Sequence, residues 1–224
     1  EQLLLLFWNI QKFLFLWFLL RKISLELRIK NFITEFPFFT EEEKRPWEFT
    51  SNIKQLVLDF QKSLNDDFII ENHIAIHKSA VIEKGAVLKS PGIICKNAFV
   101  GANSYLREGF FIAENAHIGA NCEIKSSFIG THSAIAHLNY IGNSIIGSNV
   151  NFEAGSIAAN HYNERTDKQI WVLHNNEHID TGVTKFGSIV GDSSRVGANA
   201  VLSPGTILPP HFIVKRLELI AQIP

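Results

Sequence analysis

Aliphatic side chains recur every six residues along one stretch of this chain, and that spacing limits the folds open to it. Nine such positions follow one another without a break: Ile76, Ile82, Leu88, Ile94, Val100, Leu106, Ile112, Ile118 and Ile124. An α-helix repeats its apolar face about every 3.6 residues and a β-strand every second residue, so neither alone holds this phase. Steps of five and six residues continue to Phe152, and the six-residue step resumes from Val190 to Leu208.

A repeat of this kind predicts a solenoid, in which each unit buries its apolar face only against its neighbours. Six residues on each of three sides give a coil of 18 residues, and successive coils hydrogen-bond as parallel strands about 4.8 Å apart. Small residues such as Ala80, Ala86 and Ala98 follow the aliphatic ones by four positions, where the chain turns. We therefore predict a mainly β domain over 74–208, and a C-terminal tail over 209–224 that caps the open coil edge.

The apolar N-terminal stretch over residues 3–20 leaves three interpretations open. Its length allows a membrane span, but Asn9, Gln11 and Lys12 interrupt it near the middle, where a charge is costly in a bilayer. A signal peptide carries its positive charge before the apolar stretch, whereas Arg21 and Lys22 follow it here. A helix buried against the domain or against another copy is favoured over membrane association and over a signal.

The next segment carries helix signals. Thr40 to Glu43 has the form of a capping box, and Pro46 suits the first turn of a helix. Apolar residues then fall at helical spacing, with Lys54, Asp59 and Lys62 elsewhere: Ile53, Leu56, Val57, Phe60 and Leu64. We predict an α-helical N-terminal extension over 1–70 that packs on a neighbour.

Charge and cysteine content exclude some partners. The chain of 224 residues has a formal net charge of −1 and no long basic run, which argues against nucleic acid as the main partner. The two cysteines, Cys95 and Cys122, form no metal or redox motif, so we expect a reducing, cytoplasmic compartment.

Several strings within the repeat carry a more specific resemblance. They are YLREGFFIAENAHIG (105–119), EIKSSFIG (123–130), AHLNYIGNSIIGSNVNFEAGSIAANH (136–161) and TKFGSIVGD (184–192). The repeat resembles the hexapeptide-repeat acyltransferases, whose fold is a left-handed parallel β-helix. The strings resemble the acetyltransferase domain of the bifunctional enzyme of UDP-N-acetylglucosamine biosynthesis and its archaeal sugar-1-phosphate relatives. The resemblance implies a homotrimer that uses acetyl-CoA to acetylate an amino-sugar phosphate such as glucosamine 1-phosphate.

This resemblance assigns roles to nine residues. His137 matches the catalytic base. Such a base is needed because the sugar ammonium must lose a proton before its nitrogen attacks a thioester, and imidazole titrates near the working pH. Glu123 matches a nearby acid that assists. The residues matched to the sugar phosphate are Arg107, Lys125, Tyr140, Asn151 and Lys185. Asn160 matches a position between the sugar and acetyl-CoA, and Ala198 matches a main-chain contact to the coenzyme. Arg107 and Lys125 lie 18 residues apart, so they should stack on one face as a phosphate clamp.

Four departures bear on these expectations. No Gly-rich nucleotide loop precedes the repeat, so we expect acetyl transfer without nucleotidyl transfer. His161 stands where the bacterial enzyme has a tyrosine. An insert over 162–182, with a hairpin strand before Asn175 and Asn176, predicts a lid or an arm between subunits. The expected end of the coil near Leu208 removes coils that help the bacterial enzyme to bind acetyl-CoA.

Two alternatives stay open. Taken singly, each polar residue fits a solvated surface, trimer packing or a turn, so the chain can also be a non-catalytic sugar-phosphate or nucleotide-sugar binder, or a structural trimeric scaffold. His132 and His137 are spaced like two zinc ligands of the γ-class carbonic anhydrases. Neither Cys95 nor His117 lies where the third ligand is expected, so we predict no metal site.

Overall fold

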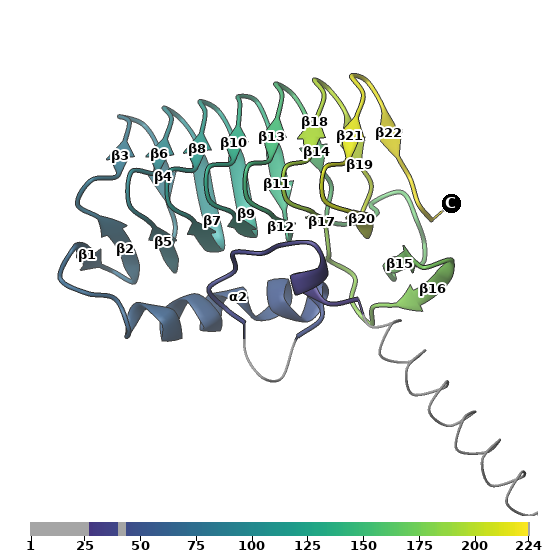
Figure 1. Cartoon of the computed structure of the whole chain (residues 1–224), viewed down its shortest axis with the longest axis horizontal. Helices are drawn as coiled ribbons and strands as arrows, with labels where there is room; N and C mark the ends of the chain where they lie inside the picture. Colours follow the sequence, from purple (N-terminus) through teal and green to yellow (C-terminus); the bar gives the residue numbers. More distant parts are fainter. Residues whose placement is uncertain (1–26, 40–43, 224) are drawn as a thin grey trace, which may run out of the picture.

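The structure, a computed structural model, describes residues 27–39 and 44–223. The main body is a parallel β-helix whose coils follow one another along the long axis of the molecule (Figure 1). The predicted fold class is therefore confirmed. The apolar stretch over 3–20 and the capping box at Thr40 lie outside the described residues. Among the helices of the described ranges, none has the length and apolar character that crossing a membrane requires.

The coils present three faces, which we number in chain order. The first face consists of β2 (Ile74–His77), β5 (Gly92–Ile94), the ends of β7 (Tyr105–Ile112) and β9 (Glu123–Ile129), β12 (Ile145–Ile146), β17 (Ser188–Val190) and β20 (Thr206–Leu208). The second face consists of β3 (Val81–Ile82), β6 (Phe99–Val100), β8 (His117–Ile118), β10 (Ala134–Ile135), β13 (Asn151–Phe152), β18 (Arg195–Val196) and β21 (Ile213–Val214).

The third face carries Arg107, Lys125 and Tyr140, which the sequence matches to sugar-phosphate binding. It consists of β4 (Val87–Leu88), the beginnings of β7 and β9, β11 (Tyr140–Gly142), β14 (Ile157–Ala158), β19 (Val201–Leu202) and β22 (Leu219–Ile220). Leu106 pairs in register with Ile124, and Ile124 with Ile141, so the short step in the sequence is absorbed without loss of register. An antiparallel strand, β1 (Phe68–Glu71), covers the N-terminal edge of β2.

The interior of the coil is filled by the side chains that the six-residue step predicts. Val100, Leu106, Ile112, Ile118 and Ile124 are all fully buried in one apolar cluster that runs through the coils. Residues with positive φ stand three positions after many of these side chains, at the corners: Asn97, Asn103, Asn115, Asn121, Asn149 and Asn199. Asparagine tolerates this left-handed conformation better than most residues, which explains why it marks the corners.

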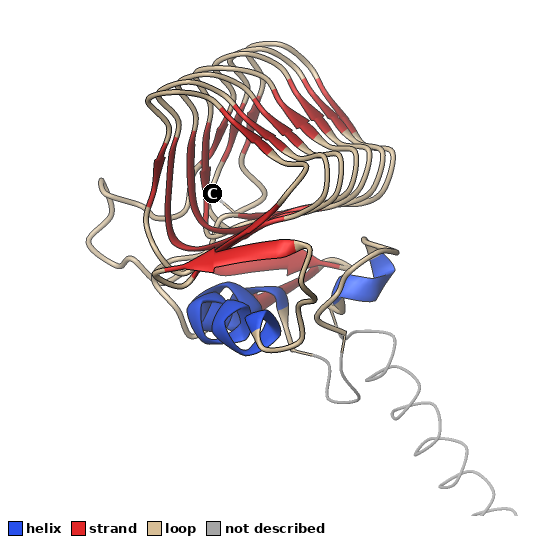
Figure 2. Cartoon of the chain, turned by 90° about the vertical axis from the view of Figure 1, so that its left-hand side faces the viewer, coloured by secondary structure: helices blue, strands red, loops and turns tan. Residues whose placement is uncertain are grey.

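The first face is covered by the N-terminal part of the chain (Figure 2). The cover consists of the 3₁₀-helix η1 (Ile29–Asn31), the loop after it and the helix α2 (Pro46–Gln61). The predicted packing of the amphipathic helix is confirmed: Ile53 and Val57 are buried, whereas Lys54 is exposed. The buried Gln61 amide donates to the carbonyls of His73 and Gly92 at 2.9 Å, which fixes the end of α2 to the coil.

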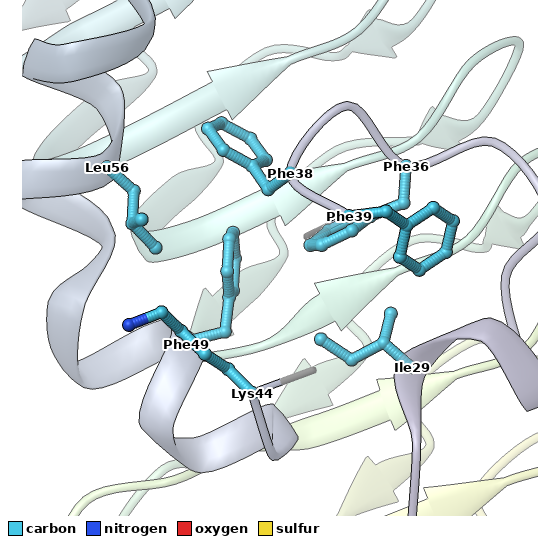
Figure 3. A pocket seen from close by; sticks show the side chains of 7 residues that line it. All are labelled: Ile29, Phe36, Phe38, Phe39, Lys44, Phe49 and Leu56. Carbon is cyan, nitrogen blue, oxygen red and sulfur yellow. The ribbon is translucent and has the colours of Figure 1, made fainter. Parts of the chain in front are cut away.

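Aromatic side chains join this cover to the outer surface of the coil. Phe36 meets Phe128 edge to face with ring centroids 4.8 Å apart, and Phe38 meets Phe111 at 5.2 Å. Figure 3 shows Phe36, Phe38 and Phe49 around a small cavity beside α2, about 30 Å³ in volume. Five of the phenylalanines that the structure describes before residue 61 thus belong to a second apolar core, outside the coil: Phe32, Phe36, Phe38, Phe49 and Phe60.

An antiparallel hairpin interrupts the coil between β14 and β17. Its strands, β15 (Trp171–His174) and β16 (Glu177–Asp180), are joined by Asn175 and Asn176, both with positive φ. This hairpin matches the predicted one. Ile170 and Val172 are fully buried, which fixes the base of the insert to the body.

The coil extends further than the sequence analysis predicted. β21 pairs in parallel with β18, and β22 with β19, so residues 209–220 complete another coil instead of forming a separate tail. The six-residue step does continue from Leu208 to Val214 and Ile220. Pro209 and Pro210 obscured it, but they lie at a corner, where the ladder requires no backbone N–H.

Candidate functional site

Two cationic side chains stand in register at one corner of the coil. Arg107 on β7 pairs directly with Lys125 on β9, as the 18-residue spacing predicts. Each residue is followed by a corner residue with positive φ, Glu108 or Ser126. The strand geometry therefore places a guanidinium and an ammonium side by side where the third face ends.

Two carboxylates neutralise part of this charge. Glu123 accepts a hydrogen bond from Arg107, with 2.7 Å between Arg107 Nε and Glu123 Oε1. Glu108 forms an ion pair with Arg107 and lies 3.7 Å from Lys125 Nζ through its Oε2. Burial lowers the pKa of Lys125; Glu108 opposes this shift, and the positive charges of Lys185 and Arg107 add to it. Lys125 is thus a largely buried cation with only partial compensation.

A chain of hydrogen bonds lies beside these charges. The Tyr140 hydroxyl donates to Asn160 Oδ1 at 3.1 Å, and Asn160 Nδ2 donates to Asn143 Oδ1 at 2.7 Å. Burial raises the pKa of Tyr140, and the neighbouring Glu123 carboxylate raises it further. Asn143 is itself a corner residue, directly after β11. Five predicted residues therefore meet at this corner: Arg107, Glu123, Lys125, Tyr140 and Asn160.

A cleft opens on the solvent side of this corner, with a volume of about 480 Å³. Its walls come from the corner residues of three coils, from the end of the insert and from α2. The lining residues are Thr50, Ser51, Ile53, Lys54, Glu108, Ser126, Asn143, Gly182, Val183, Thr184 and Lys185. The predicted Lys185 thus faces the same corner as Arg107 and Lys125. We use the name corner cleft for this site.

Three predicted residues lie elsewhere. His137 is exposed at the corner between the second and third faces, and Asn151 is exposed on β13 in the second face. Ala198 donates its N–H to Glu153 Oε2 at 2.9 Å, and its carbonyl accepts from the Leu217 N–H. Within the described part of one chain, no hydrogen bond links these residues to the corner cleft.

The residues that complete the cleft were not predicted from the sequence. Three of them directly follow a residue of the paired register at this corner: Glu108 follows Arg107, Ser126 follows Lys125, and Asn143 follows Gly142. The pairing register of the strands would therefore have located them. The contribution of α2 had no comparable signal, because the pairing of a helix with a particular corner is a long-range contact. Over residues 27–39 and 44–223, no three His, Cys, Asp or Glu side chains gather closely enough to hold a metal ion.

Comparisons with known proteins find one matching family model and relatives at moderate sequence identity. Residues 70–163 match the family described as the GMPPB C-terminal domain. The chain is 32% identical over 176 residues to the bifunctional protein GlmU of Methanococcus vannielii, covering 76% of this chain and 41% of that protein. It is also 32% identical over 180 residues to the bifunctional sugar-1-phosphate nucleotidylyltransferase/acetyltransferase of Sulfurisphaera tokodaii, covering 77% of this chain and 44% of that one.

Two solved structures are similar at low sequence identity. One is a variant of GDP-perosamine N-acetyltransferase from Caulobacter crescentus with CoA and GDP-perosamine, 16% identical, with a TM-score of 0.40 over 74% of this chain and 63% of that one. The other is the acetyltransferase domain of PglB from Neisseria gonorrhoeae with acetyl coenzyme A, 15% identical, with a TM-score of 0.36 over 64% of this chain and 54% of that one. The chain spans less than half the length of the two curated relatives.

Proposed function

This chain resembles the hexapeptide-repeat acyltransferases, and the GlmU proteins in particular, and from that premise we propose that it is an acetyl-CoA-dependent N-acetyltransferase. The proposed acceptor is the amine of an amino-sugar 1-phosphate such as glucosamine 1-phosphate. The product, an N-acetylated sugar 1-phosphate, would be a precursor of a nucleotide sugar such as UDP-N-acetylglucosamine.

The observation that carries this proposal is the cluster at one corner of three successive coils. Arg107 and Lys125 are adjacent in register, and Lys185 faces the same corner from the end of the insert. A guanidinium and an ammonium suit a phosphate, which accepts several charge-assisted hydrogen bonds. Tyr140 and Asn160 lie beside them with hydrogen-bonding groups that suit sugar hydroxyls and the acetyl donor.

The proposed reaction is a direct acyl transfer. His137 takes a proton from the sugar ammonium, and the free amine then attacks the thioester carbonyl of acetyl-CoA. A carbon–nitrogen bond forms, the nitrogen loses its second proton, and the carbon–sulfur bond breaks as CoA leaves as the thiolate. The thiolate takes up that proton, which balances the step. Backbone N–H groups stabilise the oxyanion of the tetrahedral intermediate. Glu123 holds Arg107 in place through a hydrogen bond and an ion pair, so its role is positioning as much as acid assistance.

The placement of His137 supports a site shared between copies. His137 and Asn151 are exposed away from the corner cleft, so one chain does not present all of the proposed residues to one ligand. The second and third faces also expose large apolar side chains, such as Val81, Val87 and Ile157, whereas the first face is covered by α2. We propose a homotrimer that packs through the second and third faces, with His137 of one copy beside the corner cleft of another.

Acetyl-CoA is the proposed donor. Asn160 is buried between Tyr140 and Asn143, where its amide can contact a group placed between sugar and donor. Ala198 is a weaker candidate, because its N–H and carbonyl already have partners within the chain. β21 and β22 continue the coil beyond Leu208, where the sequence predicted that the coil ends. They add part of the surface on which the expected coils would bind acetyl-CoA.

The test is release of CoA from acetyl-CoA with three acceptors: glucosamine 1-phosphate, galactosamine 1-phosphate and UDP-glucosamine. We expect turnover with at least one, and we expect His137→Ala to lower kcat by about 10²–10⁴-fold while binding of the sugar phosphate persists. Binding without turnover by the wild type would instead favour the non-catalytic sugar-phosphate binder. Unchanged turnover in His137→Ala would refute the assignment of the base.

A further inference from the structure

The corner cleft has a wall that the β-helix does not supply. Thr50, Ser51, Ile53 and Lys54 of α2 line it opposite the coil corners. The approach is close, because a Cβ on Gly109 would lie 2.9 Å from Ile53 Cγ2 and 3.1 Å from Lys54 Cγ. Gly109 has a φ of 89°, so the corner is shaped to let α2 come this near. Lys54 is therefore fixed at the mouth of the cleft by backbone packing.

The charges around the cleft are unbalanced. Glu108 is the one carboxylate among the lining residues, and it faces two lysines, Lys54 and Lys185. Behind it lies the buried Lys125, whose Nζ is 3.7 Å from Glu108 Oε2. Around the cleft stand four cationic side chains, those of Lys54, Arg107, Lys125 and Lys185, and two carboxylates, those of Glu108 and Glu123. This leaves an excess of two positive charges. A phosphate monoester carries about two negative charges near pH 7, which matches this excess.

Glu108 places its carboxylate where an anionic ligand would contact Arg107 and Lys125. Its carboxylate binds Arg107 and Lys125 together, and these are the two groups proposed to clamp the phosphate. Its side chain is 42% exposed at the edge of the cleft. A phosphate that reached Arg107 and Lys125 from the cleft would compete with this carboxylate for the same donors.

We propose that the corner cleft binds the phosphate of the substrate against α2, that Lys54 contacts it, and that Glu108 occupies its position when no substrate is bound. This inference rests on the proposed function for the identity of the ligand, a sugar 1-phosphate. It adds the N-terminal helix to the binding site and makes Glu108 a residue that sets the affinity for the phosphate. Lys54 and Glu108 thus act on the same ligand with opposite signs.

The test is direct titration of the full chain with glucosamine 1-phosphate, with glucosamine, which lacks the phosphate, and inorganic phosphate as further probes. Glu108→Gln should tighten binding of the sugar phosphate about five-fold, because it removes a competing charge but keeps the size of the side chain. Lys54→Gln should weaken it by about the same factor. Lys62→Gln is the matched control, because Lys62 lies at the end of α2 and pairs with Asp59, and it should leave the affinity unchanged.

The outcomes separate this inference from the proposed function. Affinities of Glu108→Gln and Lys54→Gln that both stay within error of the wild type overturn the cleft assignment, even if acetyl transfer proceeds. Opposite shifts for the two variants support the assignment, even if no acceptor is acetylated, and only the proposed reaction then fails. A wild-type chain that binds neither glucosamine 1-phosphate nor inorganic phosphate overturns the inference. Equal shifts with glucosamine would also contradict it, since that probe carries no phosphate.

Discussion

At the scale of single residues, the site depends on one buried lysine. Lys125 is surrounded by groups of both signs, and its burial lowers the pKa of its ammonium. Burying an ammonium is unfavourable unless an anion compensates it, and Glu108 supplies only part of that compensation at 3.7 Å. A bound phosphate would supply the rest, so Lys125 couples the protonation state of the site to ligand binding.

This coupling predicts a pH dependence of binding. The lowered pKa means that Lys125 loses its charge at a lower pH than an ordinary lysine, so affinity for glucosamine 1-phosphate should fall as pH rises through that range. Below it, Lys125 stays charged and the affinity contribution is complete. Titrations from pH 7 upwards measure the effect. Lys125→Arg should remove the decline, because arginine stays protonated; an identical decline in that variant would assign the pH dependence to another group.

At the scale of elements, the first face differs from the other two. Its outward-facing side chains are buried under α2 and the preceding loop, whereas those of the second and third faces are largely open. Phe111 and Phe128 stack with ring centroids 5.4 Å apart beneath the aromatic cover. Residues 27–39 and α2 are thus packed on the coil over an apolar surface, and α2 positions Lys54 at the cleft.

The difference between faces predicts a difference in stability effects. Ile189 on β17 points from the first face into the cover and is fully buried, whereas Ile69 on β1 is 55% exposed and lies outside the second and third faces. Ile189→Ala should lower the free energy of unfolding by about 2–5 kcal/mol. Ile69→Ala, the matched control, should change it by about 0.5 kcal/mol or less. Thermal or urea unfolding measures both. Equal costs would mean that α2 does not seal the first face.

At the scale of the whole molecule, the sequence predicted the coil well because its information is local. Each inward side chain is fixed by a six-residue step, and Arg107 and Lys125 met in register because their spacing equals one coil. Two features were not predicted, for different reasons. The last coil was missed because Pro209 and Pro210 resemble an end, and the place of α2 was missed because no repeat links Lys54 to Glu108.

Also at the scale of the whole molecule is the central claim: acetyl transfer uses the corner cleft of one copy and His137 of another. The direct test mixes two inactive variants, Lys125→Ala and His137→Ala, under conditions in which subunits exchange. CoA release with glucosamine 1-phosphate is then measured. We predict that each variant alone is inactive and that the mixture regains activity, because some interfaces combine an intact cleft with an intact His137. A mixture that stays inactive although mixed oligomers form, or single variants that retain wild-type turnover, would contradict the account.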